Sequence, residues 1–254
     1  MSIVDFSLAG RVALVTGGKS GIGRAISLAM AEAGADVAIC SRTLADGELV
    51  GVADEIRGKG RRALAVRANI SSSTDVADLV AAVMKEFGRI DIMVNNAGNY
   101  LRIPLLEMSE EDWDSIINTH LKGCYFCCQA AGKIMVAQKK GNIINIASTL
   151  GHDPRPMVGA YAAAKSGILA MTRVLAMELA PYNVRVNAIS PSLVKTRLTE
   201  RVRNDDDFKR AAAQVPLGRL SVPEDMAGAA VFFASDASSF STGQNILVDG
   251  GRYA

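Results

Sequence analysis

Apolar and polar residues follow one another along the chain in blocks that predict strands and helices in alternation. Short apolar runs bounded by glycine or polar residues are typical of strands that a parallel sheet buries on both faces. The longer stretches between these runs repeat apolar residues at helical spacing. We predict strands over residues 11–16, 36–40, 63–67, 90–94 and 142–147, and helices over residues 24–33, 44–58 and 72–87. This alternation predicts a doubly wound α/β fold, with helices on both faces of a parallel sheet.

One segment, residues 197–215, departs from the alternation. The connections look short up to about residue 197, after which the chain becomes charged and includes consecutive aspartates at 205–207. Polar segments of this kind often form lids over binding sites. We therefore predict a single domain over residues 1–254, with a substrate lid at 197–215 inside it.

The composition is that of a globular protein and excludes several classes of function. With 49% apolar and 21% charged residues among 254, the chain can bury a large core. A net charge of +2 without a long basic run gives no reason to expect nucleic acid as a partner. No apolar run approaches the roughly 18 residues of a membrane span, and the N-terminus lacks the regions of a signal peptide. We expect a cytoplasmic protein that does not bind a membrane.

The four cysteines, Cys40, Cys124, Cys127 and Cys128, form a poor disulfide framework. Three lie on one predicted helix and the fourth ends a strand, which favours buried thiols. The spacing of Cys124 and Cys127 could suggest a metal or redox site, but no second pair of ligands accompanies it. We therefore expect no metal.

A glycine-rich segment, Thr-Gly-Gly-Lys-Ser-Gly-Ile-Gly at residues 16–23, joins the first predicted strand to a helix. Gly17 would permit a tight turn, Gly21 would let a pyrophosphate approach the backbone, and Gly23 would allow close packing of helix on strand. The helix N-terminus adds unpaired N–H groups and the positive end of a dipole. This order of elements favours a dinucleotide-binding site over a plain turn.

The end of the second predicted strand carries Ser41 and Arg42. A site for NAD usually places a carboxylate here, which would repel a 2′-phosphate. No carboxylate stands at this point, whereas Arg42, Lys19 and the Ser41 hydroxyl offer donors to a phosphate. Alternatively, Arg42 is a solvated surface residue. The sequence favours NADP(H) over NAD(H).

Tyr161 and Lys165 lie four residues apart among helix formers, so both project from one helix face. A cation beside a phenol favours the phenolate, so we expect Lys165 to lower the pKa of Tyr161. Ser148 ends a predicted strand thirteen residues earlier, where its hydroxyl would enter a cleft at the carboxyl edge of the sheet. Such pairs also occur by chance on many helices, so their meaning depends on the rest of the chain.

Together these motifs resemble the classical short-chain dehydrogenase/reductase family. The matching segments follow the family's order and spacing over nearly the whole chain, at residues 16–23, 95–98, 148, 161–165, 187–191 and 248–251. The resemblance implies a seven-stranded Rossmann-type sheet and, usually, a homotetramer. It also implies hydride exchange between a nicotinamide cofactor and an alcohol or ketone.

The resemblance further assigns roles by matched position. It implies that Tyr161 is the acid and base at the substrate oxygen, that Ser148 hydrogen-bonds this oxygen and that Lys165 binds the nicotinamide ribose. Two hydroxyl donors would stabilise an oxygen that gains charge in the transition state. The expected cofactor contacts are Gly17, Lys19, Ser20, Gly21, Ile22, Gly23, Ser41, Arg42, Asn69, Ile70, Asn95, Ala97, Gly98, Tyr161, Lys165, Pro191 and Thr196.

One catalytic position departs from the family pattern. The asparagine expected seven residues after Trp113 is His120, and Asn118 lies nearly on the opposite helix face unless the helix is rewound. In the family this asparagine holds a water that links the lysine to solvent. His120 could hold the water and shuttle the proton, since a histidine pKa lies near neutrality. Alternatively, it only packs beside the site.

The substrate is the least determined part of the sequence interpretation. Tyr100, Arg102, His152 and Arg155 lie near the catalytic residues in sequence. The three cations could bind an anionic group, or they could contact only water. We expect a small polar ketone or hydroxy compound, with a 3-oxoacyl thioester as the alternative and an NADP-binding sensor as a further possibility. Residues 110–138 and 159–180 would form the contact between subunits of the implied homotetramer.

Overall fold

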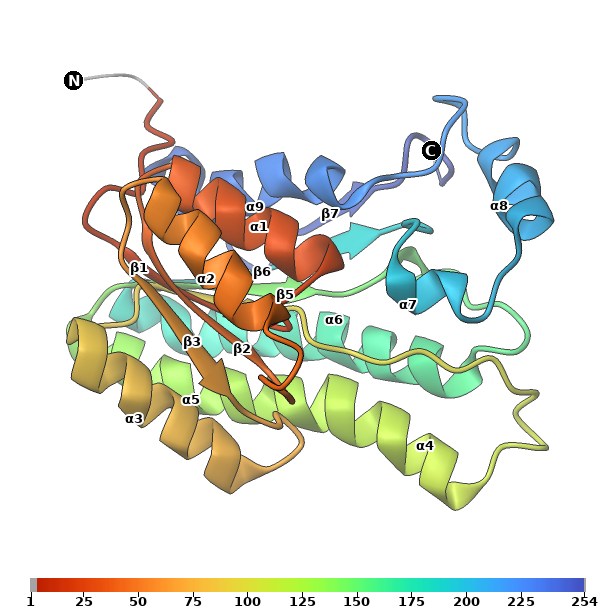
Figure 1. Ribbon diagram of the computed structural model, residues 1–254, viewed down its shortest axis with the longest axis horizontal. Helices are drawn as coiled ribbons and strands as arrows, with labels where there is room; N and C mark the ends of the chain where they lie inside the picture. Colours follow the sequence, from red (N-terminus) through yellow and green to blue (C-terminus); the bar gives the residue numbers. More distant parts are fainter. Residues whose placement is uncertain (1–3, 254) are drawn as a thin grey trace.

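The computed structural model describes residues 4–253 and contains a seven-stranded sheet (Figure 1). Its strands are β1 (Val12–Thr16), β2 (Asp36–Ser41), β3 (Ala63–Arg67), β4 (Ile92–Asn95), β5 (Gly141–Ile146), β6 (Val184–Pro191) and β7 (Asn245–Val248). All neighbours are parallel, in the order β3-β2-β1-β4-β5-β6-β7. The predicted doubly wound sheet, and the number of strands that the family resemblance implied, are confirmed.

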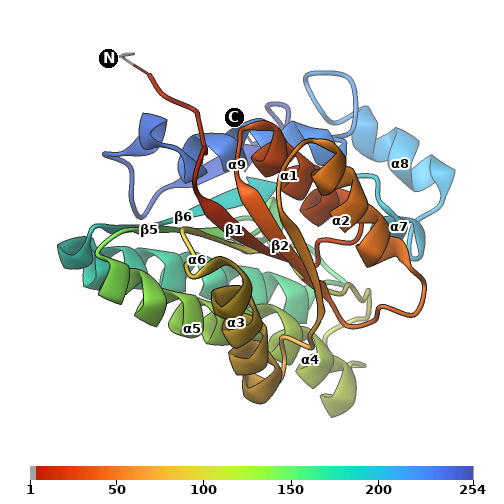
Figure 2. The same cartoon turned by 60° about the vertical axis from the view of Figure 1, so that its left-hand side comes forward.

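Helices cover both faces of the sheet (Figure 2). One face carries α1 (Gly21–Glu32), α2 (Glu48–Gly58) and α9 (Ala227–Ala234), and the other carries α3 (Ser73–Phe87), α5 (Gly123–Gln138) and α6 (Gly159–Leu179). The remaining helical segments are α4 (Glu110–Ile117), η1 (Asn118–Lys122), η2 (Thr149–Gly151), η3 (Ala180–Tyr182), α7 (Arg197–Glu200), α8 (Asp205–Ala212), η4 (Pro223–Met226) and η5 (Asp236–Ser238).

The first strand shows why the apolar runs predict buried strands. Val12 and Leu14 pack into the core below α3, α5 and α6, whereas Ala13 and Val15 pack into the core below α1, α2 and α9. Successive side chains of a strand point to opposite faces, so a strand covered by helices on both sides needs apolar residues at every position. This burial fixes the sheet between its two helical layers.

The strand order reverses between β1 and β4, because the chain winds outward to β3 before it returns to the centre. Ligands of open α/β sheets bind outside the carboxyl ends of the strands at such a switch point. The segments after Thr16 and Asn95, the last residues of β1 and β4, therefore mark the expected position of a binding site.

A π-helical turn, η1, joins α4 to α5, and the backbone stays helical at both junctions. It carries His120, whereas the sequence interpretation assumed regular helical winding there. A π turn adds a residue to the helix and rotates its faces, and such turns occur often at functional sites. His120 is buried at the site, while Asn118 does not line the cleft described below.

The predicted lid contains two helices, α7 and α8, separated by residues 201–204. Both lie at the end of the molecule where the C-terminus also lies (Figure 1). Cys40, Cys124, Cys127 and Cys128 are buried free thiols, as expected. Within residues 4–253 no cluster of metal-ligating side chains occurs, and none of the helices there has the length and apolar character to cross a membrane.

Candidate active site

A cleft of about 750 Å³ lies at the carboxyl ends of the central strands. The glycine-rich segment, the ends of β2, β4, β5 and β6, the N-terminal half of α6 and the predicted lid line it. Arg252 and Tyr253 line it as well, which the sequence interpretation did not anticipate. The cleft is large enough for a dinucleotide together with a small substrate.

The glycine-rich segment packs as its residue types predict. Gly17 and Gly21 have positive φ angles of 66° and 56°, which favour glycine. A Cβ on Gly23 would lie 2.3 Å from the carbonyl oxygen of Gly17, so Gly23 serves packing and does not line the cleft. Asn96, which sequence reasoning missed, holds this turn because its Nδ2 donates to Thr16 O over 2.9 Å. The glycines of this turn thus leave space for a phosphate beside the backbone.

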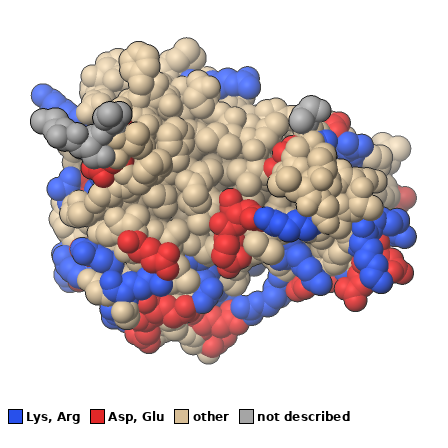
Figure 3. Space-filling model, turned by 90° about the horizontal axis from the view of Figure 1, so that it is seen from above, with Lys and Arg blue, Asp and Glu red and all other residues tan. Residues whose placement is uncertain are grey.

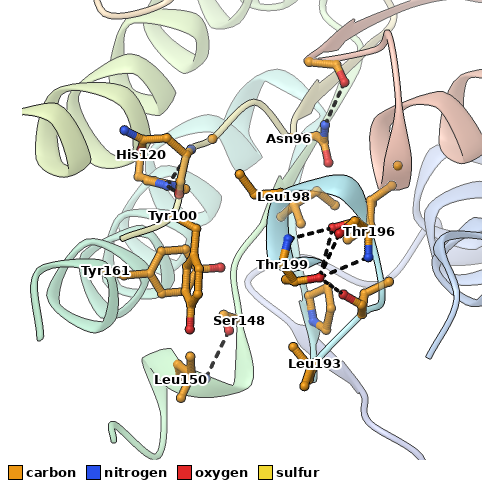
Figure 4. A pocket seen from close by; sticks show the side chains of 18 of the residues that line it. Asn96, Tyr100, His120, Ser148, Leu150, Tyr161, Leu193, Thr196, Leu198 and Thr199 are labelled. Atoms are coloured by element: carbon orange, nitrogen blue, oxygen red, sulfur yellow. Dashed lines mark hydrogen bonds between the residues drawn. The ribbon is translucent and has the colours of Figure 1, made fainter. Parts of the chain in front are cut away.

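The predicted lid follows Thr196, which lies directly against the glycine-rich segment. A Cβ on Gly21 would lie 3.5 Å from Cγ2 of Thr196, the residue that caps α7. The cap is reciprocal: Thr196 Oγ1 accepts from Thr199 N, and Thr199 Oγ1 accepts from Thr196 N over 3.0 Å (Figure 4). Arg197 on α7 binds Glu48 on α2 over 2.5 Å. These contacts hold Thr196 at the wall of the cleft.

The predicted phosphate donors at the end of β2 differ in their partners. Lys19 is bound to Asp46, and Glu48 lies 3.5 Å away, so the pKa of Lys19 is raised chiefly by its hydrogen bond to Asp46. The Ser41 hydroxyl donates to Thr43 O over 2.6 Å. Arg42 is exposed, lines the cleft and forms no ion pair with a described residue. Arg42 is therefore the cation that is free to bind a phosphate here.

The predicted catalytic side chains converge on the cleft (Figure 4). Tyr161 hydrogen-bonds Ser148, and Ser148 Oγ accepts from Leu150 N over 3.1 Å. The Lys165 ammonium lies 5.5 Å from the centre of the Tyr161 ring and donates to Ile146 O over 2.5 Å. A serine, a tyrosine and a lysine from the segment after β5 and from α6 thus share one site, as the sequence predicted.

The electrostatics of this group differ from the sequence expectation. The pKa of Tyr161 is raised, because burial disfavours the phenolate more than the hydrogen bond from Ser148 favours it. Burial also lowers the pKa of Lys165 to about 8. The expectation that Lys165 depresses the pKa of Tyr161 is therefore wrong for this structure, because desolvation outweighs a cation that binds a carbonyl instead. Tyr161 is a neutral phenol at neutral pH.

His120 is 4% exposed and is held by the turn after β4. Its Nε2 lies 2.7 Å from Asn99 O and accepts from Asn99 N over 3.2 Å in the alternative tautomer, so both tautomers have a partner at Nε2, while Nδ1 has no described partner. The ring packs on Gly98, where a Cβ would lie 2.3 Å from His120 Cε1. Burial, and then the charge of Lys165, lower the pKa of His120 to about 3. The expected pKa of His120 near neutrality is wrong, because a buried imidazolium would lose its hydration.

The predicted substrate residues separate into two groups. Tyr100, Arg102 and Arg155 line the cleft, and the Tyr100 ring packs edge-on against Tyr161 with ring centres 5.1 Å apart. His152 does not line it, because its Nε2 contacts Asn245 Nδ2 over 2.8 Å. Arg155 is already bound to Asp153.

The remaining expected cofactor residues also separate into two groups. Asn95 is buried behind the cleft, where its Nδ2 donates to Asn145 Oδ1 over 2.8 Å. The side-chain amide of Asn95 therefore joins β4 to β5 instead of facing the cofactor. The others line the cleft: Ser20, Ile22, Asn69, Ile70, Ala97, Gly98, Pro191 and Thr196. Leu193 and Leu198, which sequence reasoning missed, add apolar side chains to the lining, the latter from α7 in the predicted lid (Figure 4).

Comparison with known proteins identifies relatives over the whole chain. The sequence model of a family described as Enoyl-(Acyl carrier protein) reductase matches residues 17–252. A 2-dehydro-3-deoxy-D-gluconate 5-dehydrogenase of Escherichia coli K12 is 40% identical over 258 residues, covering 100% of both chains. A 3-oxoacyl-[acyl-carrier-protein] reductase of Thermotoga maritima is 38% identical over 244 residues, covering 96% of this chain and 98% of its own.

Solved structures agree with these sequence matches. A short-chain type dehydrogenase/reductase from Mycobacterium marinum superposes with a TM-score of 0.93 at 38% identity, covering 98% of both chains. A protein from Beutenbergia cavernae, provisionally described as an NAD(P) dependent gluconate 5-dehydrogenase with bound NADP at low occupancy, gives a TM-score of 0.92 at 41% identity. The coverage is again 98% of both chains.

Proposed function

Because the chain belongs to the short-chain dehydrogenase/reductase family of oxidoreductases, we propose that it transfers hydride between NADP(H) and a secondary alcohol or ketone of a small polar substrate. The observation that carries this proposal is the convergence of Ser148, Tyr161 and Lys165 on a cleft whose other wall is the glycine-rich turn. A dinucleotide fits this wall because Gly17 and Gly21 line it without side chains, so that a pyrophosphate can approach the backbone.

The chemistry follows from the protonation states of the site. NADP(H), when bound, supplies or accepts the hydride at the substrate carbon. In reduction, the neutral phenol of Tyr161 donates its proton to the substrate oxygen as negative charge develops there, and the Ser148 hydroxyl donates a second hydrogen bond. The ammonium of Lys165, 5.5 Å from the ring centre, stabilises the phenolate that this transfer leaves. In oxidation, Tyr161 takes the proton back.

His120 supports this group as a positioning residue in the proposal. Its pKa of about 3 keeps the imidazole neutral, so it does not carry the proton as an imidazolium. Nδ1 is buried without a described partner, on a ring that lines the small cavity beside Lys165. A neutral ring nitrogen there would orient a water next to the ammonium, as donor or acceptor according to the tautomer, without adding a competing charge.

The preference for NADP(H) rests on Arg42, which forms no ion pair with a described residue, and on the lack of a carboxylate at the end of β2. Lys19 contributes only if a phosphate displaces Asp46 from it. The bound NADP in the Beutenbergia cavernae structure agrees with this preference.

A cytoplasmic location and a homotetramer remain predictions. Light scattering coupled to gel filtration measures the oligomeric state.

The alternative substrate is a 3-oxoacyl thioester, which the similarity to the Thermotoga maritima reductase favours. The same trio of side chains would reduce either substrate, so the two proposals differ only at the mouth of the cleft. The test is oxidation of NADPH, and separately NADH, by small keto acids, ketoses and 3-oxoacyl thioesters, followed by absorbance. Turnover that favours NADPH and a small ketone is expected. Faster turnover of the thioester selects the alternative, and tight NADPH binding without turnover indicates a cofactor-binding sensor.

A further inference from the structure

The cleft is far more basic than the protein as a whole, whose net charge is +2. Ten of the described residues that line it are lysine or arginine, and one, Asp207, is acidic. At the surface, acidic and basic side chains are mixed, both at the end of the molecule that carries α7 and α8 and at the opposite end (Figure 3). A concave surface lined by one sign of charge raises the local concentration of the opposite ion.

The cofactor alone does not account for this charge. The phosphates of the cofactor would bind at the glycine-rich turn and at the end of β2, where Lys19 and Arg42 lie. The other cations, apart from Lys165, lie in the segment after β4, in the loop before α6, on the lid and near the C-terminus. They belong to segments of the cleft other than the glycine-rich turn and the end of β2.

Several of these arginines already have acidic partners and are not available to a ligand. Their pairs are Arg155 with Asp153, Arg197 with Glu48 and Arg210 with Asp207. Arg102 has no hydrogen bond or ion pair with a described residue, and its Nε is buried without an acceptor. Nε of Arg203 is buried and unpaired as well, although Asp207 lies within electrostatic reach of Arg203.

The unpaired arginines line the same cleft, and contacts tie the segments beside them to one another. The segment of Arg102 is tied to the loop before α6, because Ile103 N donates to Met157 O over 2.9 Å. Near the C-terminus, Arg252 donates to Gln214 over 2.6 Å at the end of the predicted lid. Arg203 lies on the same predicted lid, before α8. Three segments far apart in sequence thus contribute cations to one cleft.

A buried guanidinium N–H without an acceptor costs free energy, and an anion that enters the cleft would restore its hydrogen bond. We propose that Arg102 and Arg203, with Arg252 at the rim, bind an anionic group on the substrate, a carboxylate or a phosphate. This inference rests on the proposed oxidoreductase function and narrows its substrate to a small anionic ketone or hydroxy compound. It replaces the pair His152 and Arg155 that the sequence suggested, because the structure engages both elsewhere.

The test compares pairs of ketones in which one member carries an anionic group and the other is neutral. The carboxylate arm uses levulinate against levulinamide, and the phosphate arm uses dihydroxyacetone phosphate against dihydroxyacetone. We expect Arg102→Gln and Arg203→Gln to lower kcat/KM for the anionic member of the preferred pair by about 10- to 100-fold, the loss expected for a charge-assisted hydrogen bond. The neutral member should change by less than about twofold. The arm with the larger charge preference identifies the anion.

Lys85→Gln provides the control, because Lys85 is exposed on α3, outside the cleft, and its loss changes the net charge equally. It should leave every rate unchanged. Equal losses on charged and neutral ketones in Arg102→Gln, or a wild type that prefers the neutral members, would overturn the inference.

A binding measurement separates failure of this inference from failure of the proposed function. Calorimetric titration of levulinate, and of inorganic phosphate, into the NADP-saturated protein needs no turnover. Binding of either probe that weakens by about tenfold or more in Arg102→Gln and persists in Lys85→Gln supports the anion site even if no ketone is reduced. If neither probe binds the wild type, the anion site is wrong, whatever ketones the enzyme reduces.

Discussion

Replacing Gly98 by alanine would drive a methyl group into the ring of His120. A Cβ at position 98 would lie 2.3 Å from His120 Cε1 and 3.1 Å from each ring nitrogen. The ring cannot withdraw freely, because it is 4% exposed and bound to Asn99 O over 2.7 Å. Overpacking of this kind costs about 1–3 kcal/mol, and we expect the free energy of unfolding to fall by that amount.

Urea unfolding of a double-mutant cycle measures whether His120 causes the loss. In a His120→Ala background the methyl group meets no ring, so Gly98→Ala should cost less than about 0.5 kcal/mol there. Gly51→Ala serves as the control, because Gly51 lies on α2 and an added Cβ there would meet no atom within 4 Å. It should stabilise the protein by about 0.5–1 kcal/mol through helix propensity. An equal cost of Gly98→Ala in both backgrounds would refute the described packing of His120.

Three further predictions concern the cofactor and the buried lysine. Gly23→Ala should weaken NADPH binding in a fluorescence titration, because its Cβ would lie 2.3 Å from Gly17 O; unchanged affinity would contradict the packing role of Gly23. Arg42→Ala should weaken NADPH by about tenfold more than NADH, and equal losses would contradict the preference for NADP(H). Burial lowers the pKa of Lys165 to about 8, below its unfolded value, so the unfolded state binds more protons above that pH. In unfolding titrations, wild type should therefore gain stability relative to Lys165→Met as the pH rises from 8 toward 10.5; no relative gain would show that Lys165 is not desolvated.

The sheet could be predicted from the sequence because its strands are buried on both faces and so carry continuous apolar runs. Residues 12–15 illustrate this, since every position packs into a core. The glycine-rich turn could be predicted as well, because the close backbone approach at Gly23 admits no side chain and so requires glycine. Features that depend on local steric fit and burial can therefore be predicted from residue type.

The features that escaped prediction depend on contacts between distant segments. Arg252 lines the cleft and contacts Gln214 at the end of the predicted lid. It lies near the C-terminus, whereas the glycine-rich turn of the same cleft lies near the N-terminus. The contact of His152 with Asn245 could not be predicted either, because Asn245 lies on β7, 93 residues away along the chain. The pKa predictions for Tyr161 and His120 failed because spacing reveals neighbours on a helix but not the extent of burial.

In the proposed reduction, hydride reaches a substrate carbon while Tyr161 donates the proton to the oxygen on that carbon. The most direct measurement supplies NADPH deuterated at the transferred position with a small keto acid and follows the product by mass spectrometry, in wild type and in Tyr161→Phe. We expect deuterium on the carbinol carbon of the wild-type product, and a rate lower by about 100- to 10,000-fold in Tyr161→Phe with NADPH binding retained. A product without deuterium would contradict hydride transfer from the cofactor, and undiminished turnover in Tyr161→Phe would contradict the role of Tyr161 as proton donor.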